Sequence, residues 1–384
     1  MKQVYADYNA TYPCSDQHLD TVTRVIRKCQ GNPSSIHSFG RDAKLLLEQS
    51  RSQVAALFGA PRQNVFFTSG ATEANNLALH SSIANAKAMM IQTLPHVVIT
   101  EGEHPSILAP VEAMVASQSL QCDFAKLTPS GRVDIEDLLQ LIRPESTFVS
   151  FFFVNSETGA IHDIGNLTRQ IKSSFPKVHI HVDCVQGLGK LDLTWLHTSE
   201  IDSASGSAHK LGGLKGIGCL YHKKPRTISP MIYGGGQEMS MRSGTENMPG
   251  LISFGLRAKE IIHSPTWWKP GVKVCTKLYE QIQNTKGIYI HGDFKTSTQT
   301  TLNLHFEDLS VEKVMLHFDT CGIAISRGSA CSSGSSNASR TLLSMGYSED
   351  IAKNSLRISF GADSIPEHAD FIATQIQALI EGNT

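Results

Sequence analysis

The chain has 384 residues, of which 40% are hydrophobic, and a formal net charge of −1 at pH 7. This length suffices for about two domains with large cores, and the near-neutral charge argues against direct nucleic-acid binding. The N-terminus has no apolar signal segment and no run of about 18 apolar residues occurs, so we expect a cytoplasmic protein that does not enter a membrane. The eight cysteines form no Cys-x-x-Cys pair, which indicates reduced thiols rather than a disulfide framework or a zinc ribbon.

Apolar runs and helical patterns alternate along the first part of the chain. The runs predicted to be buried strands are 65–68, 97–100, 148–153 and 178–182. Helical periodicity covers 41–58, 72–88, 105–117, 134–142 and 163–174. This alternation predicts an α/β unit, a mainly parallel sheet with helices on both faces. Residues 256–384 mix helices with short strands such as 301–306 and 355–360, which indicates a smaller α+β unit.

An acidic residue ends one predicted strand and a lysine follows the next. Asp183 closes the segment His-Ile-His-Val-Asp, and Lys210 closes Ser-Gly-Ser-Ala-His-Lys. A carboxylate that keeps a pyridine nitrogen protonated, and an amine that forms a Schiff base, are what pyridoxal 5'-phosphate (PLP) chemistry requires. The alternative is a metal cluster of His179, His181 and Asp183 on one strand face. We expect no metal, because Cys184 follows and the further histidine of such metallo-hydrolases is missing.

A phosphate site is predicted where the strand 65–68 meets the helix 72–88. In Thr-Ser-Gly-Ala-Thr-Glu, Gly70 allows a tight turn while the amides of Ala71 and Thr72 point at an anion. The alternative is a simple helix cap, since Ser or Thr with a nearby Glu is a common capping arrangement. The glycine cluster 212–218 lacks a nucleotide-binding spacing, so we expect it to be a turn beside the lysine.

The ordered set of short motifs in this chain resembles the cysteine desulfurases, which are fold-type I, class-V aminotransferase-like PLP enzymes. The motifs are Ser69–Glu73, Glu103–His104, Val182–Gln186, Ser207–Lys210, Met241–Thr245, Gly328–Cys331 and Leu356–Phe360. The resemblance implies a large PLP-binding domain, residues 14–255, with a mainly parallel seven-stranded sheet. It also implies a smaller α+β domain made of residues 1–13 and 256–384, which carries the cysteine loop.

The resemblance also assigns roles around the cofactor. Lys210 would hold PLP as a Schiff base and move the Cα proton, and Asp183 would pair with the pyridinium nitrogen. His104 would stack on the ring as a catalytic imidazole, although a structural core histidine is the alternative. Further cofactor contacts would come from Ala71, Thr72, Asn155, Gln186, Ser207, His209 and, across a dimer interface, Thr245.

Substrate binding needs a cation for the α-carboxylate, and Arg357 lies in the matching strand motif. Its guanidinium suits that task because it binds a carboxylate in a bidentate way. The alternative is a structural salt bridge between domains. Asn155 is expected to contact the substrate and cofactor. The chain reads Asn155-Ser156 where many family members have two asparagines, so the role of Ser156 stays open.

Cys331 distinguishes the reaction type, because only a soft thiolate attacks the sulfur of a bound cysteine readily. It lies in Gly-Ser-Ala-Cys, within a serine-rich stretch too polar for a core, and Arg327 nearby could favour the thiolate. The long loop resembles the branch that serves iron–sulfur cluster assembly and thio-modification.

The sequence therefore predicts a homodimeric, PLP-dependent cysteine desulfurase that converts L-cysteine to L-alanine and passes a persulfide sulfur to an acceptor protein. That acceptor would be an assembly scaffold or a thio-modification enzyme, and the sequence does not identify it. Within the same fold, the alternatives are selenocysteine lyase and another PLP-dependent lyase or aminotransferase. From another class, the alternative is a catalytically inactive scaffold.

Overall fold

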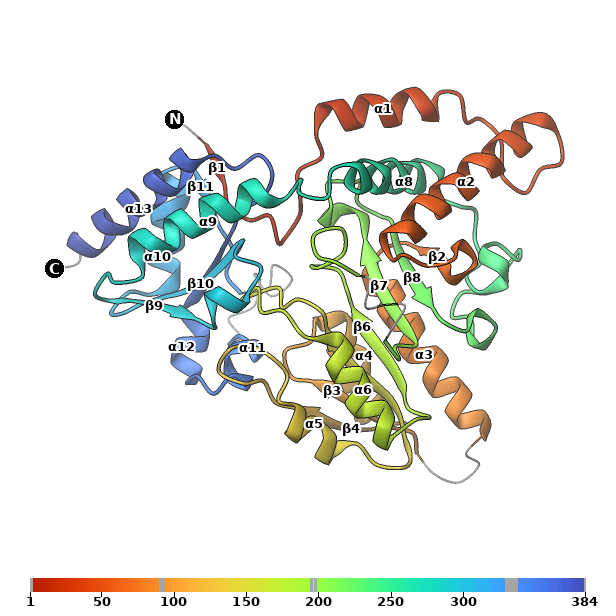
Figure 1. The fold of residues 1–384 in the computed structure, drawn as a ribbon, viewed down its shortest axis with the longest axis horizontal. Helices are drawn as coiled ribbons and strands as arrows, with labels where there is room; N and C mark the ends of the chain where they lie inside the picture. Colours follow the sequence, from red (N-terminus) through yellow and green to blue (C-terminus); the bar gives the residue numbers. More distant parts are fainter. Residues whose placement is uncertain (1–2, 90–93, 194–195, 197–198, 329–337, 383–384) are drawn as a thin grey trace.

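A seven-stranded sheet forms the centre of the larger of two lobes (Figure 1). We describe a computed structural model that covers residues 3–89, 94–193, 196, 199–328 and 338–382. The strand order is β2-β8-β7-β6-β5-β3-β4. Strand β8 runs in the opposite direction to the other six, which are parallel to one another. The strands are β2 (Val65–Thr68), β3 (His96–Thr100), β4 (Gln121–Ala125), β5 (Ser146–Phe152), β6 (His179–Asp183), β7 (Ser203–Ser207) and β8 (Gly218–His222).

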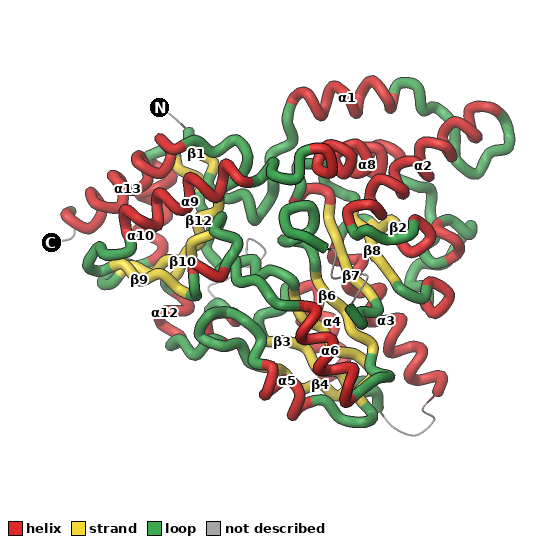
Figure 2. Tube along the Cα trace, in the orientation of Figure 1, coloured by secondary structure: helices red, strands yellow, loops and turns green. Residues whose placement is uncertain are grey.

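Helices cover both faces of this sheet, as Figure 2 shows. Val97 and Ile99 of β3 pack with one face, against α3 and α4, while Val98 packs into the core on the other face. That second core also holds side chains of α2, α5, α6 and α8. Both faces are apolar because successive side chains of a strand point to opposite sides. The helices are α1 (Asp16–Ile26), α2 (Ser38–Leu57), α3 (Ala71–Met89), α4 (Pro105–Ala116), α5 (Ile135–Leu141), α6 (Ile164–Ser174) and α8 (Met248–His263).

The smaller lobe contains the antiparallel sheet β12-β10-β9 and the parallel pair β1-β11. Leu302, Leu304, Leu356 and Ile358 point to a core shared with α9, α10 and α13, while the alternate residues of these strands face away from it. The elements are β1 (Val4–Tyr5), α9 (Lys269–Ile282), β9 (Ile288–His291), β10 (Thr301–Phe306), α10 (Val311–Thr320), β11 (Ile323–Ala324), β12 (Ser355–Ser359) and α13 (Pro366–Glu381). The short helices α11 (Arg340–Ser344) and α12 (Glu349–Lys353) precede β12 and pack Leu342 and Ala352 into the core of the larger lobe.

The observed architecture confirms the expected fold class, and the strands and helices begin and end within a few residues of their predicted bounds. The expected domain boundary between residues 255 and 256 falls inside α8. Ala258 and Ile261, in the second half of this helix, belong to the core of the larger lobe. We therefore propose that the division lies after α8. No helix in the described part of the chain is both long and apolar enough to cross a membrane.

Candidate active site

A cavity of about 530 Å³ lies where the two lobes meet. The smaller lobe contributes Arg357 of β12. Residues 9–11 also line the cavity, and Asn9 N donates a hydrogen bond to Ser359 Oγ of β12. The larger lobe contributes the turn after β2 and the ends of β6 and β7. Of the predicted site residues, the cavity is lined by Ala71, Thr72, His104, Asp183, Gln186, Ser207, His209, Lys210 and Arg357.

Lys210 is held by backbone carbonyls from the start of the chain. It follows β7 in a short 3-10 turn, Ala208–Lys210, and its Nζ donates to Asn9 O at 2.6 Å and to Ala10 O at 2.9 Å. The turn continues into the glycine cluster, where Gly212 and Gly216 have positive φ angles of 87° and 81°. This confirms that the cluster forms the connection between β7 and β8.

Asp183 is a buried carboxylate whose two oxygens both accept hydrogen bonds. Val185 N donates to Oδ1 at 2.9 Å, and Asn75 Nδ2 of α3 donates to Oδ2 at 3.0 Å. Asn75 has no exposed surface, and the sequence analysis did not select it. The two nitrogens of His181 lie within hydrogen-bond distance of Ser203 and Asn75, an arrangement that leaves neither for a metal.

His104 caps the start of α4. Its Nδ1 accepts from Ser106 N at 3.1 Å and lies 2.8 Å from Ser106 Oγ. Burial lowers the pKa of His104, an effect that Asp183 opposes and Lys210 reinforces. The imidazole is therefore neutral, with its ring in the cavity wall, as stacking on a planar ligand requires.

The start of α3 provides the predicted phosphate cradle. The first amides of a helix have no partner within it, and Ala71 and Thr72 stand at this position beside the cavity. Glu73 also caps the turn, since its Oε2 accepts from Ser69 N at 2.8 Å, so the capping alternative holds for that one residue. The backbone of β8 packs directly beneath, where a Cβ on Gly218 would lie 2.6 Å from Gly70 Cα.

Further residues complete the cradle. Ser207 and His209 line the cavity, and so does Lys215, which the sequence analysis missed although it lies in the glycine cluster. Burial, with the charges of Lys210 and Lys215, lowers the pKa of His209 to about 4. A neutral His209 and a nearby lysine suit an anionic phosphate group.

The geometry of this cavity fits PLP. Gln186 donates through Nε2 to Asn9 O at 3.0 Å, while its buried Oε1 has no hydrogen-bond partner among the described residues. Buried polar atoms are normally satisfied, so an orphaned atom in the wall indicates a ligand with a polar group at this place. An amine, a carboxylate and a helix start also surround the cavity, which is the donor set that PLP requires.

Arg357 is 1% exposed, and its guanidinium makes hydrogen bonds inside the protein. Its Nη2 donates to Asp7 Oδ1 at 2.8 Å, and its Nη1 donates to Ser156 O at 3.0 Å. Asp7 and Arg357 both lie in the smaller lobe, so this salt bridge is local to that lobe and is not the bridge between domains considered as the alternative. The guanidinium also lines the cavity, and its Nε has no partner among the described residues, so N–H donors remain for a substrate carboxylate.

The chain matches the model of class-V aminotransferases over residues 4–371. "Cysteine desulfurase IscS" of Dictyoglomus turgidum is 30% identical over 386 residues, which cover 99% of this chain and 95% of that protein. "Cysteine desulfurase IscS" of Rickettsia peacockii is 33% identical over 389 residues, which cover 98% and 91%. The chain belongs to the class-V aminotransferase family, in its cysteine desulfurase branch.

A solved structure shows the same similarity in three dimensions. A NifS-like protein superposes with a TM-score of 0.88 at 29% sequence identity, and the match covers 99% of this chain and 100% of that one. The family uses PLP, which agrees with the donor set of the cavity. This class-V enzyme therefore has the overall fold and the family that its motifs predicted.

Two predicted site residues lie away from the cavity wall of this class-V enzyme. Asn155 Oδ1 accepts from Glu157 N at 2.8 Å and Thr158 N at 2.9 Å, so it stabilises a turn, and its neighbour Ser156 lines the cavity instead. Thr245 is exposed and does not line the cavity of its own chain. Their contacts with cofactor and substrate stay predictions.

Cys331 lies outside the described residues, but the structure describes the chain up to residue 328. Ser326 exchanges two backbone hydrogen bonds with Arg357, at 3.1 and 2.7 Å, so the described chain contacts Arg357 five positions before Cys331. Arg327 pairs with Glu312 at 2.8 Å and donates to Lys353 O at 2.9 Å. These contacts occupy the guanidinium that was considered as a partner of the thiolate.

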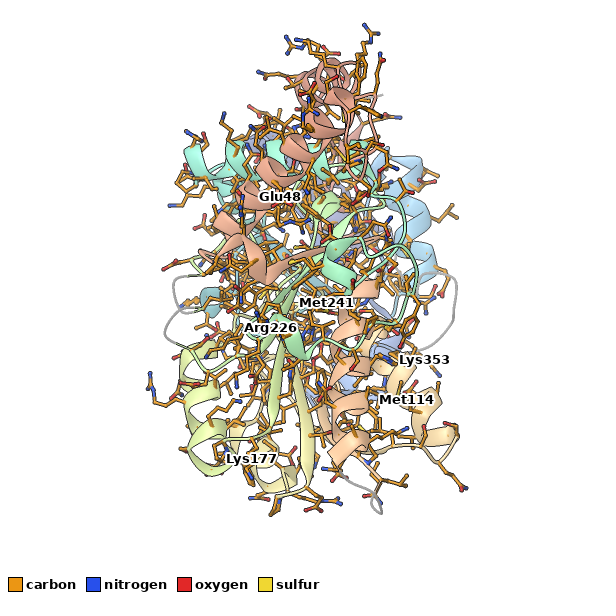
Figure 3. The ribbon with its side chains drawn as sticks, turned by 90° about the vertical axis from the view of Figure 1, so that its right-hand side faces the viewer. Glu48, Met114, Lys177, Arg226, Met241 and Lys353 are labelled. Atoms are coloured by element: carbon orange, nitrogen blue, oxygen red, sulfur yellow. The ribbon has the colours of Figure 1, made fainter. Side chains whose placement is uncertain are left out.

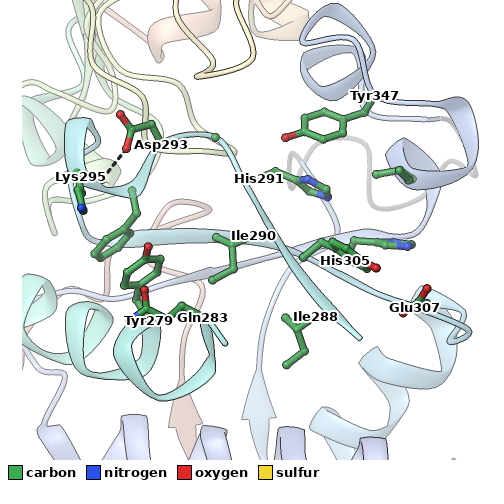
Figure 4. A pocket seen from close by; sticks show the side chains of 14 residues that line it. Tyr279, Gln283, Ile288, Ile290, His291, Asp293, Lys295, His305, Glu307 and Tyr347 are labelled. Carbon is green, nitrogen blue, oxygen red and sulfur yellow. Dashed lines mark hydrogen bonds between the residues drawn. The ribbon is translucent and has the colours of Figure 1, made fainter. Parts of the chain in front are cut away.

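A second hollow, of about 880 Å³, lies along the edge strand β9 (Figure 4). Tyr279, His291, His305 and Tyr347 stand around it, and Asp293 interacts with Lys295 at its rim. None of the predicted site residues that the structure describes lines this hollow, so we assign the chemistry to the cavity between the lobes.

Proposed function

We propose that this protein is a PLP-dependent cysteine desulfurase that converts L-cysteine to L-alanine and retains the sulfur as a persulfide on Cys331. The observation that carries the proposal is the meeting of Lys210, Asp183 and Arg357 in one cavity, although they come from distant parts of the chain. An amine, an acid for a ring nitrogen and a cation for a carboxylate are the minimum set for PLP chemistry on an amino acid.

Five sets of contacts would hold the cofactor. Lys210 would bond its aldehyde, Asp183 its ring nitrogen and Gln186 its ring oxygen, and His104 would cover one face of the ring. The phosphate would be bound by Ala71, Thr72, Ser207, His209 and, from a second subunit, Thr245. When bound, PLP stabilises negative charge at the Cα atom of an attached amino acid.

The substrate would bind through its carboxylate to Arg357, with Asn155 nearby. Lys210 would then take the proton from Cα. It would later return protons to Cα and to the carbon that becomes the alanine methyl group, and the second of these protons replaces the one that the Cys331 thiol loses on ionising. The position of Lys210 at the carbonyls of Asn9 and Ala10 supports this role, because those acceptors hold the amine at the cavity wall between proton transfers.

Cys331 would supply the thiolate that accepts the sulfur. The bond between the substrate Cβ and its sulfur breaks as a bond forms between that sulfur and Cys331 Sγ, which yields alanine and a persulfide without an external oxidant. Cys331 follows Ser326 by five positions, and an extended chain of that length reaches about 17 Å. The strand contact between Ser326 and Arg357 thus leaves the thiol within range of a substrate held by Arg357.

The persulfide would pass its sulfur to an acceptor protein of iron–sulfur cluster assembly or thio-modification in the cytoplasm. The names of the relatives support the assembly pathway.

We also propose a homodimer, since the loop that carries Thr245 exposes large apolar side chains. Tyr233 is 80% exposed and Met239 is 49% exposed. In Figure 3 this loop, marked by Met241, lies on the same face as Glu48 of α2.

Reduction of the PLP-loaded protein with borohydride, followed by peptide mapping, tests the cofactor assignment. The adduct should lie on Lys210. Lys190 is the informative competitor, because burial and the charge of Lys210 lower its pKa to about 7, which leaves a nucleophilic amine near the site. An adduct on Lys190, or no adduct, would contradict the proposal. Without any bound PLP, the inactive scaffold becomes the better interpretation.

A further inference from the structure

A continuous chain of buried hydrogen bonds lies behind Asp183. Asn75 Nδ2 donates to Asp183 Oδ2 at 3.0 Å, and Asn75 Oδ1 lies 2.9 Å from His181 Nε2. His181 Nδ1 lies 2.8 Å from Ser203 Oγ, which in turn lies 2.7 Å from His179 Nε2. Asn75, His181 and Ser203 are each 0% exposed. The chemistry proposed above gives none of them a role.

The charge of Asp183 sets the direction of every hydrogen bond in this chain. An ionised carboxylate only accepts, so the Asn75 amide must present its NH₂ group to Asp183 and its oxygen to His181. His181 then carries its proton on Nε2 and accepts on Nδ1 from Ser203. Burial lowers the pKa of His179 to about 3 and that of His181 well below its usual value, so both rings are neutral. All donors therefore point towards Asp183, and such aligned hydrogen bonds reinforce one another.

Asn75 also reaches the histidine on the cavity wall. Its Nδ2 donates a second hydrogen bond to Ser106 Oγ at 2.8 Å. Ser106 Oγ lies 2.8 Å from His104 Nδ1, which already accepts from Ser106 N. Nδ1 is therefore an acceptor, and His104 carries its proton on Nε2. One amide thus orients both the acid expected at the ring nitrogen and the imidazole expected over the ring.

We propose that Asn75 and His181 are positioning residues that keep Asp183 ionised and correctly oriented, and thereby keep the pyridine nitrogen of the cofactor protonated. The proposal rests on the PLP cofactor proposed above. Without the Asn75 donor, a lone pair of a buried carboxylate is left unsatisfied, which favours the protonated acid. A protonated Asp183 no longer stabilises a charged ring nitrogen. Without His181, the Asn75 amide is free to turn over and present its oxygen to Asp183.

The test is the ¹⁵N NMR signal of PLP labelled at the ring nitrogen and bound to the protein at neutral pH. We expect a protonated nitrogen in the wild type and a shift towards the unprotonated signal in His181→Leu. His181→Gln should restore the wild-type signal, because its amide places an N–H near the position of His181 Nε2. The PLP dissociation constant of His181→Leu should rise about tenfold through the weaker ring contact, and His181→Gln should reverse most of that rise.

A matched control is His96→Leu, which removes another buried histidine from the same sheet. His96 interacts with Ser146 and Asp123 and is not part of the hydrogen-bond chain behind Asp183, so the ring-nitrogen signal should not change. Asn75→Leu is a second variant and should act like His181→Leu. If the wild type binds no PLP, the proposed function fails. If the wild type binds PLP with a protonated nitrogen, and His181→Leu or Asn75→Leu gives the same signal, the positioning role is wrong.

Discussion

At the scale of single residues, Glu103 is a buried carboxyl group close to Asp183. It is 4% exposed, and its Oε1 accepts from Ser150 Oγ at 2.7 Å. Burial, reinforced by the charge of Asp183, raises the pKa of Glu103 from 4.5 to about 8. Glu103 is therefore protonated at neutral pH, in contrast to the hydrogen-bonded carboxyl group of Asp183 beside it. Among the described residues that line the cavity, Asp183 is the only acidic one, so it is the carboxyl group available to a ring nitrogen.

Glu103→Gln should make the stability of the protein less dependent on pH between about pH 4.5 and pH 8. Because the folded-state pKa lies above the unfolded value, the folded protein binds more protons between about pH 4.5 and pH 8. The stabilising contribution is fully present below that range and is lost as pH rises through about 8. We expect wild-type stability to fall by a few kcal/mol over this range, and the variant to lose much less.

Urea unfolding of the apoprotein at several pH values measures this effect. Glu136→Gln is the control, because it changes an exposed glutamate of α5 in the larger lobe, whereas Glu103 lies buried in the turn before α4. Parallel pH profiles for the wild type and Glu103→Gln would show that Glu103 is ionised throughout.

At the scale of elements, the phosphate turn is set by how closely β8 approaches the start of α3. A Cβ on Gly218 would lie 2.5 Å from the carbonyl carbon of Gly70 and 2.8 Å from Ala71 N. These contacts are backbone atoms, which cannot rotate away. At Gly70 itself, a Cβ would have no neighbouring atom within 4 Å, and φ is not in the left-handed region. Gly218 rather than Gly70 therefore carries the steric requirement.

Gly218→Ala should therefore displace the turn and weaken PLP binding by about tenfold or more, with a stability loss of about 1–3 kcal/mol. Equilibrium dialysis and thermal melting of the apoprotein measure the two effects. Gly70→Ala is the control for stability, since the space around it is open, and its melting temperature should stay near that of the wild type. Equal melting temperatures for Gly218→Ala and the wild type would contradict this account.

Sequence reasoning predicted the elements well because strand and helix periodicity is local. It also predicted the positions of Lys210 and Asp183, since the ends of neighbouring strands meet at one edge of a sheet. It missed Asn75 because that contact depends on how α3 crosses the sheet. The carbonyls of Asn9 and Ala10 that hold Lys210 were equally hidden, because backbone atoms some 200 residues away leave no signal in residue type.

At the scale of the whole molecule, the cavity needs both lobes, because Arg357 comes from the smaller lobe and Lys210 from the larger one. The N-terminal segment connects them. Asn9 donates to Ser156 O at 3.1 Å and to Thr301 Oγ1 at 2.9 Å, while its own carbonyl accepts from Lys210. Movement of one lobe relative to the other would therefore change the distance between Arg357 and Lys210.

A mixed dimer tests whether Thr245 completes the site of a second subunit. Thr245→Val homodimers should bind PLP more weakly, and Lys210→Ala homodimers should form no covalent adduct. In a mixed dimer, the only site with Lys210 should receive Thr245 from the Lys210→Ala subunit and regain wild-type PLP affinity. Affinity that stays at the Thr245→Val level would show that Thr245 acts within its own chain, or not at all.

The central claim is that sulfur leaves L-cysteine and arrives on Cys331, and mass spectrometry of the PLP-loaded protein after treatment with L-cysteine tests it most directly. We predict one additional sulfur on the peptide that contains Cys331, with an equal amount of L-alanine. Cys331→Ala should retain PLP and lose both products. An additional sulfur on another thiol such as Cys321, or alanine formation by Cys331→Ala at the wild-type rate, would contradict the account and favour a different PLP-dependent lyase.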